Sequence, residues 1–208
     1  MSFQLEEIED PVIFDIGANI GKTLDRFGVE FRHPEIHAFE PGKVAFDILS
    51  RKSFKHSSVT INNLGIGSEL SSLTLNQNEF IDMSSFLPSG KHSWGNIENT
   101  IEVPVTTVDN YASENGIDYI HILKSDTQGF DLEVMKGSQR MMSENRIKLV
   151  YFEFIFSDMY QNLPNFDEIF NYLRENNFEV VAFYDQHFQD GKLGWADFLF
   201  INTAGVDK

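Results

Sequence analysis

The chain of 208 residues has no cysteine, which excludes disulfides, thiolate metal sites and cysteine nucleophiles and is typical of proteins from reducing compartments. Basic residues are scarce: 16 Lys and Arg stand against 32 Asp and Glu, giving a formal net charge of -16. Such a surface repels a phosphate backbone, so we expect no nucleic acid as substrate or partner. The sequence also lacks an apolar run long enough to cross a membrane, and its acidic start, residues 1–10, lacks the basic region of a signal peptide. We therefore expect a cytoplasmic protein without a membrane partner.

Apolar residues, by contrast, make up 41% of the chain and include 20 Phe, which is enough for one sizeable core. We expect residues 1–208 to form a single domain. Short apolar runs alternate with segments of helical period, which is the pattern of βαβ units and of a parallel sheet covered on both faces. The predicted strands are Val12–Ile16, 36–39, 59–64, 119–125, 149–154, 178–184 and 198–201, with less regular β segments at 72–75 and 103–108.

Helices are predicted at residues 21–27, after Pro41, after Ser125 and at 166–176. Residues 79–100 have no clean period and are rich in Ser, Gly, Asn and His. A structureless stretch of this length inside a compact domain is usually functional or disordered. We interpret it as an active-site lid or acceptor-binding loop, with a plain mobile excursion as the alternative.

The most informative stretch joins the first strand to the first helix and runs Asp15-Ile-Gly-Ala-Asn-Ile-Gly21. Gly17 and Gly21 let the backbone approach a ligand, and the following helix points its partly positive N-terminus at the same place. Glu40 lies 23 residues beyond Gly17, about where an open α/β sheet places a carboxylate against a ribose diol. The pattern predicts a pocket for a nucleoside cofactor.

Two other nucleotide-binding classes fit this stretch poorly. Asn19 occupies the middle glycine of the dinucleotide fingerprint, which disfavours an NAD-linked oxidoreductase. Ile16 occupies the first glycine of a phosphate-binding loop, which disfavours an NTPase. Asp15 ends the first strand, where we expect it to accept hydrogen bonds from the glycine turn and from a ligand ammonium; the alternative is that it only caps the turn.

Three stretches together resemble the FkbM family of S-adenosylmethionine-dependent methyltransferases: residues 15–21, Phe39-Glu-Pro41, and Leu123-Lys-Ser-Asp-Thr-Gln-Gly-Phe-Asp131. The first two are shared by many methyltransferases. The third stretch, together with the apolar run 149–154 followed by Tyr160 and Pro164, narrows the resemblance to this family. The resemblance extends from about residue 12 to residue 201. The resemblance implies an α/β Rossmann-like class I methyltransferase fold, with a mostly parallel seven-stranded sheet, an antiparallel last strand and helices on both faces.

The resemblance also implies roles for individual residues. Gly17, Asn19 and Gly21 would cradle the methionine part of the cofactor, and Glu40 would bind the ribose hydroxyls. Asn62, Asn63 and Leu64 are candidates to frame the adenine, or else ordinary residues of a strand-end turn. The full set of implied cofactor-binding residues is Asp15, Gly17, Ala18, Asn19, Gly21, Glu40, Pro41, Asn63, Leu64 and Asp126.

Two carboxylates on the expected carboxyl rim are candidates for the catalytic base. Asp126 follows the strand 119–125 and is the first choice, while Glu153 lies at the end of the strand 149–154. The alternative for Glu153 is a structural hydrogen bond to backbone or to Lys124. No His, Asp or Glu spacing predicts a dedicated metal site, although a loosely held divalent ion at Asp126 or Glu153 stays an open alternative.

The predicted function is transfer of a methyl group from S-adenosylmethionine to a hydroxyl of a sugar, glycan precursor or glycosylated small metabolite. Acceptor identity should come from residues 79–100, 156–166 and 184–195. Gln128 and Asp131 stand where many family members have Glu, so the alternative is a catalytically inactive module that binds a nucleoside or a partner. The aromatic residues that could stack on a sugar ring, or else belong to the core, are Trp94, Tyr160, Tyr184, Phe188 and Trp195.

Overall fold

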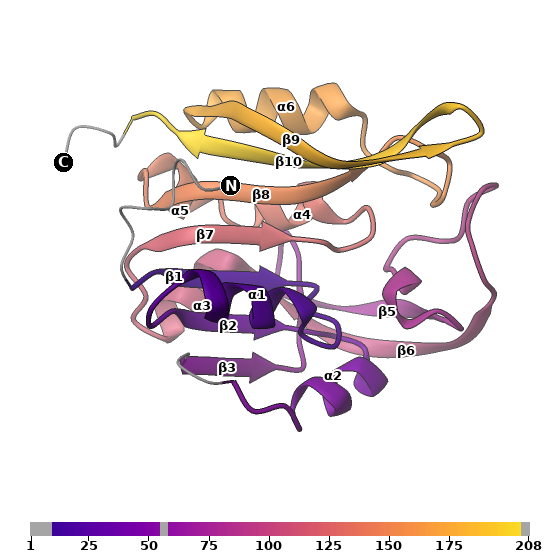
Figure 1. The fold of residues 1–208 in the computed structure, drawn as a ribbon, viewed down its shortest axis with the longest axis horizontal. Coiled ribbons are helices and arrows are strands. Elements are labelled where there is room, and N and C mark those ends of the chain that lie inside the picture. Colours follow the sequence, from indigo (N-terminus) through magenta and orange to yellow (C-terminus); the bar gives the residue numbers. More distant parts are fainter. Residues whose placement is uncertain (1–9, 55–57, 205–208) are drawn as a thin grey trace.

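The computed structural model describes residues 10–54 and 58–204. The acidic start of the chain, apart from Asp10, lies outside the described residues, as do both ends of the predicted domain. The main sheet has seven strands in the order β3-β2-β1-β7-β8-β10-β9 (Figure 1). Their bounds are β1 Val12–Ile16, β2 Glu35–Phe39, β3 Ser58–Asn62, β7 Ile120–Ser125, β8 Ile147–Ile155, β9 Phe178–Gln189 and β10 Lys192–Asn202.

Strand directions follow the sequence prediction. The neighbours from β3 to β8 pair in parallel, whereas β10 is antiparallel to both β8 and β9. The β9–β10 hairpin closes through Asp190 and Gly191, both with positive φ, as a two-residue turn between twisted strands prefers. The mostly parallel seven-stranded sheet with an antiparallel last strand is thereby confirmed.

Helices cover both faces because alternate residues of each strand point to opposite sides. In β1, Ile13 packs in one buried cluster with Leu24 and Leu49, from helices α1 (Lys22–Glu30) and α2 (Lys43–Leu49). Phe14 belongs to the cluster on the other face. The helices that contribute to that second cluster are α3 (Val108–Glu114), α4 (Asp131–Lys136), α5 (Gln139–Ser143) and α6 (Phe166–Glu175).

A small second sheet extends beyond the carboxyl ends of the parallel strands (Figure 1). It consists of β4 (Gly65–Ile66), β6 (Ile97–Thr106) and β5 (Ser71–Asn78), in the order β4-β6-β5, and the short helix η2 (Ile81–Met83) follows β5. Part of the stretch expected to be irregular, 79–100, is therefore ordered in η2 and in the start of β6. We refer to β5, η2 and β6 with their connecting segments, residues 71–106, as the flap.

Two local expectations differ from the structure. The predicted β segment 103–108 ends at Thr106, since the Thr107 hydroxyl accepts a hydrogen bond from the Asn110 amide (3.0 Å) and so caps helix α3. The helix after β7 is two helices, because Gly137 breaks it where the chain meets the Gly67 carbonyl. A Cβ at residue 137 would lie 2.0 Å from that oxygen.

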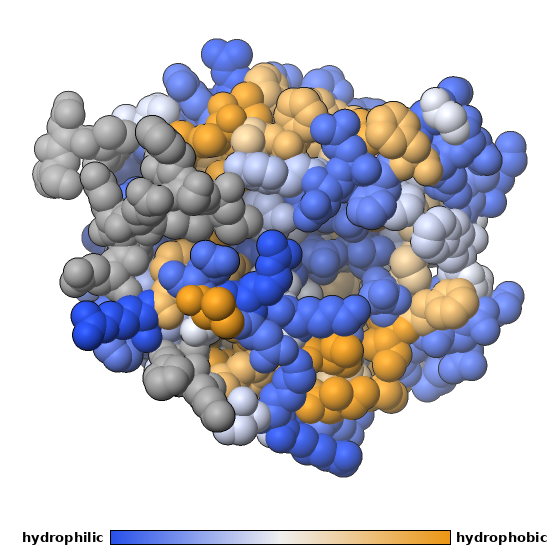
Figure 2. All heavy atoms as spheres, in the orientation of Figure 1, coloured by the Kyte–Doolittle hydropathy of each residue, from blue (hydrophilic) through white to orange (hydrophobic). Residues whose placement is uncertain are grey.

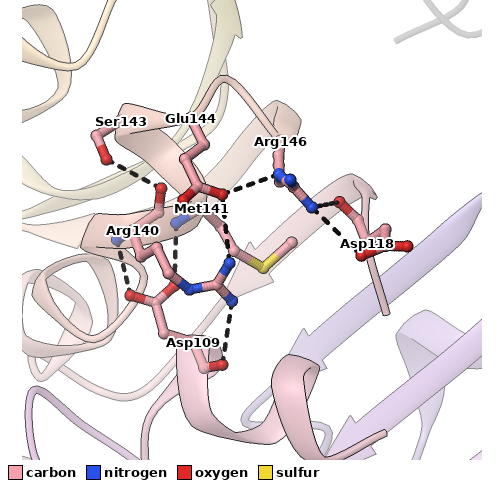
Figure 3. A network of polar contacts seen from close by, with 7 residues as sticks. All are labelled: Asp109, Asp118, Arg140, Met141, Ser143, Glu144 and Arg146. Atoms are coloured by element: carbon pink, nitrogen blue, oxygen red, sulfur yellow. Dashed lines mark hydrogen bonds and ion pairs between the residues drawn. The ribbon is translucent and has the colours of Figure 1, made fainter. Parts of the chain in front are cut away.

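At the amino ends of β7 and β8, a polar network joins α3 to α5 (Figure 3). The Asp109 carboxylate accepts from the backbone amides of Arg140 and Met141, the second and third residues of α5, at 2.7 and 3.1 Å. Arg140 pairs with Glu144, and Arg146 pairs with Glu144 and Asp118. Two of the few cations of the chain are thus used at the edge of the sheet opposite the carboxyl ends.

The outer strand β9 presents apolar side chains to solvent. Val180, Val181 and Phe183 are exposed by 47%, 39% and 56%. Figure 2 shows apolar residues gathered along the top edge of the molecule, over α6 and the β9–β10 hairpin. Within the described ranges, no helix combines the length and apolarity that crossing a membrane would require.

Candidate active site

A cavity of about 280 Å³ lies where the carboxyl ends of β1, β2, β7 and β8 face the flap. Ligands in open α/β sheets bind at this edge because the loops that leave the strands there diverge. The predicted site residues that line the cavity are Gly17, Asn19, Glu40, Pro41, Leu64, Asp126 and Glu153. Those that do not line it are Asp15, Ala18, Gly21 and Asn63.

The glycine turn after β1 is held by the neighbouring strand. Gly17 has φ +76°, and a Cβ there would lie 1.9 Å from the Asp126 carbonyl oxygen, so only glycine fits. The amides of Gly17 and Ala18 both donate to the Phe39 carbonyl at 3.0 Å. The expectation that Asp15 accepts hydrogen bonds from this turn is therefore wrong.

Asp15 is instead paired with Lys124 of β7. Both side chains are buried, and the Lys124 Nζ lies 2.8 Å from Asp15 Oδ1, 3.8 Å from Asp126 Oδ2 and 3.2 Å from the Gly17 carbonyl. Burial alone would lower the pKa of Lys124, but the carboxylates of Asp15 and Asp126 raise it above its ordinary value. The charged ammonium therefore holds the two strand ends and the glycine turn together. Sequence analysis missed this role, although Lys124 and Asp15 each stand in a recognised motif.

Glu40 faces the cavity with both carboxyl oxygens anchored. Oε2 accepts from the Asn19 amide at 2.8 Å, and Oε1 accepts from the Gly42 amide at 2.7 Å. Each oxygen keeps a further lone pair for a ligand hydroxyl. Burial raises the pKa of Glu40 to about 7, although the two amides oppose this shift. The two amides thus fix the orientation of the Glu40 side chain, and its pKa near neutrality allows it to gain or lose a proton around pH 7.

Several other residues expected around the cofactor contact the protein backbone and core instead of the cavity. Asn63 donates from Nδ2 to the carbonyls of Glu40 and Pro41, at 2.8 and 3.0 Å, and Asn62 donates to the Ala38 carbonyl at 3.1 Å. Ala18 is buried in the cluster on the α1 face. A Cβ on Gly21 would meet Leu49 at 2.6 Å. Of the candidates proposed to frame an adenine ring, only Leu64 lines the cavity.

Asp126 and Glu153 are joined by an amide that the sequence did not single out as a connector. Gln128 Nε2 lies 3.0 Å from Asp126 Oδ1 and 3.2 Å from Glu153 Oε1. The Tyr160 hydroxyl donates toward Gln128 Oε1 at 2.8 Å, which fixes the amide with its nitrogen toward the two carboxyls. Gln128 has φ +54°, and its own carbonyl accepts from Ser85 of the flap at 2.8 Å.

The charge of Glu153 is controlled by its surroundings. Burial, followed by the nearby carboxylates of Asp126, Asp197 and Asp131, raises its pKa to about 9, and the Gln128 hydrogen bond only partly opposes this. Glu153 is therefore protonated at neutral pH. The structural partner expected for it was Lys124 or backbone, but within the described residues the partner is Gln128.

Asp131 does not line the cavity. It is buried and accepts from the Ser125 hydroxyl at 2.5 Å and from the Thr127 amide at 3.3 Å, and so holds the turn between β7 and α4. Burial raises its pKa to about 6. In the described part of the chain, no group of three or more His, Asp or Glu is arranged to hold a metal ion.

Part of the cavity wall is apolar and aromatic. Trp94 of the flap and Trp195 of β10 meet edge to face, with ring centroids 5.4 Å apart. Tyr160 is buried in a small core cluster, and neither Tyr184 nor Phe188 lines the cavity. Of the five aromatic residues considered for stacking on a sugar ring, Trp94 and Trp195 are the two that line the site.

A comparison with protein families agrees with this geometry. Residues 15–180 match the methyltransferase FkbM domain. The chain belongs to the FkbM methyltransferase family. It is an S-adenosylmethionine-dependent methyltransferase, and S-adenosylmethionine is its cofactor.

Individual proteins similar to this FkbM methyltransferase have low sequence identity to it. The chain is 26% identical over 190 residues to the 2-O-methyltransferase NoeI of Sinorhizobium fredii, covering 86% of this chain and 76% of that protein. Magnesium protoporphyrin IX methyltransferase (ChlM) from Synechocystis PCC 6803, solved with bound S-adenosylmethionine, matches with a TM-score of 0.55 at 7% identity, over 95% of this chain and 73% of that one. Precorrin-6y C5,15-methyltransferase from Geobacter metallireducens matches with a TM-score of 0.50 at 11% identity, over 93% and 80%. At these identities, the two structures establish the class I methyltransferase fold alone.

The cavity suits the cofactor. Gly17 lines the cavity with its backbone, and Glu40 offers a carboxylate in the same cavity. Asn19 lines the cavity, and its buried Oδ1 has no hydrogen-bond partner among the described residues. A buried oxygen of this kind is normally satisfied by a donor, and a ligand ammonium or hydroxyl supplies one.

Proposed function

We propose that this FkbM methyltransferase methylates a hydroxyl group of a sugar, a glycan precursor or a glycosylated small metabolite. The observation that carries the proposal is the pair of carboxyls, Asp126 and Glu153, joined by Gln128 in a cavity that Trp94 and Trp195 also line. Aromatic side chains together with carboxyl groups in one cavity suit a ring that is apolar on its faces and carries hydroxyls at its edge. The similarity to a 2-O-methyltransferase supports oxygen as the methylated atom.

For the cofactor, we assign contact to the residues that line the cavity. Glu40 would accept from the ribose hydroxyls, Asn19 would accept from the ammonium of the methionine part, and Leu64 would pack against the adenine. Asp15, Ala18, Gly21 and Asn63 would act by holding the turns in place, since each contacts protein rather than the cavity.

For the reaction, the bound cofactor supplies an electrophilic methyl group on a positively charged sulfur. Asp126 would accept the proton that the acceptor hydroxyl loses, because it lines the cavity at the carboxyl end of β7 and its side chain is 41% exposed. Glu153, with a pKa near 9, is protonated at neutral pH and would donate a hydrogen bond that orients the acceptor. The flap would exclude water from this arrangement.

The test is transfer of tritiated methyl from S-adenosylmethionine to a panel of sugars, sugar nucleotides and small glycosides. We expect Asp126→Asn to lower kcat by roughly 100-fold or more and to leave cofactor binding intact. Asp118→Asn, at an exposed aspartate on the amino side of the sheet, is the matched control and should leave the rate unchanged. Equal rates for Asp126→Asn and the control would reject Asp126 as the base.

Cofactor binding is tested separately by thermal shift. S-adenosylmethionine and its demethylated product should both raise the melting temperature, and Glu40→Ala should remove most of that shift. An unchanged shift would reject the ribose assignment. Normal cofactor binding without transfer to any acceptor would instead favour the alternative of an inactive binding module.

A further inference from the structure

The ionisable side chains that line the cavity are all carboxyls, within the part of the chain that the structure describes. Glu40, Asp82, Asp126 and Glu153 contribute carboxyl groups, and none of the described residues that line the cavity is Lys, Arg or His. Asp82 is placed on η2, at the flap side, whereas Asp126 and Glu153 lie at the ends of β7 and β8. A molecule between them therefore meets carboxyl groups from two directions.

Several basic residues of the chain are paired away from the cavity. Lys124 is buried behind the cavity, against Asp15 and the Gly17 carbonyl. Lys52 pairs with Asp25, at 2.8 Å. Arg140 and Arg146 belong to the network at the opposite edge of the sheet (Figure 3). These cations are not positioned to pair with an anionic group inside the cavity.

The remaining wall offers apolar faces. Trp94 and Trp195 meet at 82°, and Met83, Phe86 and Met159 complete the surface around them. His187 stacks against Trp195, with ring centroids 4.9 Å apart, and itself does not line the cavity. Indole faces bind uncharged ring edges and cations, and they give no compensation to an anion.

We infer that the acceptor which enters this cavity is uncharged or carries an amine, and that phosphate, sulfate and carboxylate groups are excluded from the ring that is methylated. The inference rests on the proposed hydroxyl methylation and narrows its substrate class to neutral glycosides and amino sugars. Sugar phosphates, uronic acids and nucleic acids are disfavoured for the same reason, because each would bring an anion against carboxyl groups without a cationic side chain in the cavity lining to pair with it. The raised pKa of Glu153 is consistent with this, since the site already resists one more negative charge.

The first test separates acceptors by charge. A small-molecule extract is passed over an anion-exchange resin, and the unbound and bound fractions are each incubated with the protein and tritiated S-adenosylmethionine. Labelled product should form from the unbound fraction at a rate at least tenfold above the bound fraction. Preferential labelling of the bound, anionic fraction would overturn the inference and leave methyl transfer itself established. No labelling in either fraction, with cofactor binding intact, would remove the proposed function and the inference together.

The second test changes the charge of the wall. Asp82→Lys replaces an exposed carboxylate that lines the cavity, so the fold should tolerate it. Using matched probes, methyl α-D-glucopyranoside and glucose 6-phosphate, the variant should move the ratio of rates toward the phosphate by roughly tenfold. If neither sugar is methylated, competition by each against labelling of the unbound extract fraction gives the same ratio.

The matched control is Glu98→Lys, which makes the same charge change on the flap at an exposed residue outside the cavity. It should leave the ratio of rates at its original value. An equal shift in both variants would mean that only the net charge of the protein matters, and it would overturn the assignment of selectivity to the cavity wall.

Discussion

Asp15 and Lys124 are direct partners in the parallel β1–β7 pair, and their side chains form a buried ion pair with a 2.8 Å separation. The same ammonium reaches the Gly17 carbonyl and approaches Asp126. One cation therefore connects the glycine turn of the cofactor side with the carboxylate proposed as the base. Its removal should affect stability and catalysis together.

We expect Lys124→Met to lower the free energy of unfolding by about 3–5 kcal/mol, because Asp15 would be left buried without a countercharge. The double variant Lys124→Met, Asp15→Leu should recover a large part of that loss. Denaturant unfolding measures both. The control is Lys136→Met, which breaks the partly exposed pair with Glu133 and should cost less than about 1 kcal/mol. A loss no greater than that of the control would contradict the structural role of the buried pair.

Gly17→Ala should abolish cofactor binding and destabilise the fold. Its φ of +76° strains any residue with a side chain, and its Cβ would overlap the Asp126 carbonyl at 1.9 Å. Gly116→Ala isolates the first effect, because Gly116 has φ +67° but open space around it. We expect about 1–2 kcal/mol of destabilisation for Gly116→Ala and clearly more for Gly17→Ala, measured by thermal unfolding with and without S-adenosylmethionine. Similar values for the two variants would show that the contact with β7 is unimportant.

Gln128 should act through the two carboxyls that it joins. Gln128→Leu removes the bridge, so we expect kcat to fall about tenfold or more, with cofactor affinity nearly unchanged. Gln128→Glu places a third carboxyl between Asp126 and Glu153 and should move the rate profile to higher pH. Gln161→Leu, which loses only a hydrogen bond to the Ser89 carbonyl, is the control. If Gln128→Leu and the control have the same kcat and pH profile, Gln128 has no positioning role.

The ionisation of Glu153 should make stability depend on pH. Its pKa rises from an ordinary value of 4.5 to about 9 in the folded protein, so between these values the folded state holds a proton that the unfolded state has lost. The free energy of unfolding should therefore fall as pH increases from about 4.5 to about 9. Glu153→Gln keeps the shape and cannot ionise, so its melting temperature should increasingly exceed that of the wild type as pH rises to about 9, and the difference should vanish near pH 4.5. A constant difference across this range would contradict the assignment.

The same group should link cofactor charge to pH. A cation in the cavity stabilises the ionised form of Glu153, so binding of S-adenosylmethionine should release protons. The ratio of the affinity for S-adenosylmethionine to the affinity for its demethylated product, whose sulfur is uncharged, should increase between pH 6 and pH 8.5. Calorimetry in buffers of different ionisation enthalpy measures the proton release, and Glu153→Gln should reduce it. Equal pH dependence for both ligands would argue against a charge interaction at this site.

The sequence was sufficient for features that depend on local pattern. The bounds of β1 were predicted as they occur, and Glu40 was placed at the cavity, because apolar period and chain spacing determine both. Helix α2 shows the limit of such patterns. Val44, Ala45, Ile48 and Leu49 all recur within a broad apolar arc, yet the structure buries Ala45 and Leu49 and leaves Val44 and Ile48 exposed. In a helix of 7 residues, Val44 and Ile48 form one apolar row and Ala45 and Leu49 form the next. Which row is buried depends on how the helix packs against the sheet.

Contacts between distant segments could not be predicted in this way. The Lys124 pair depends on the register of β1 against β7, and the Gln128 bridge depends on a left-handed residue after β7 that can reach Glu153 of the neighbouring strand β8. Asn63 was a candidate to frame the adenine or else an ordinary residue of a strand-end turn, and in the structure its amide donates to the carbonyls of Glu40 and Pro41. A single sequence predicts which residues follow the carboxyl ends of the strands, whereas the contacts made in the fold determine which of their side chains line the cavity.

The flap forms its own sheet, β4-β6-β5, while the residues proposed to hold the cofactor belong mainly to loops of the other sheet. In the proposed function, the flap contributes to acceptor recognition together with Asp126, Glu153 and Trp195 of the main sheet. Residues 79–96, between β5 and β6, could be exchanged among relatives as a cassette, altering which molecule is modified while the chemistry of transfer is inherited intact.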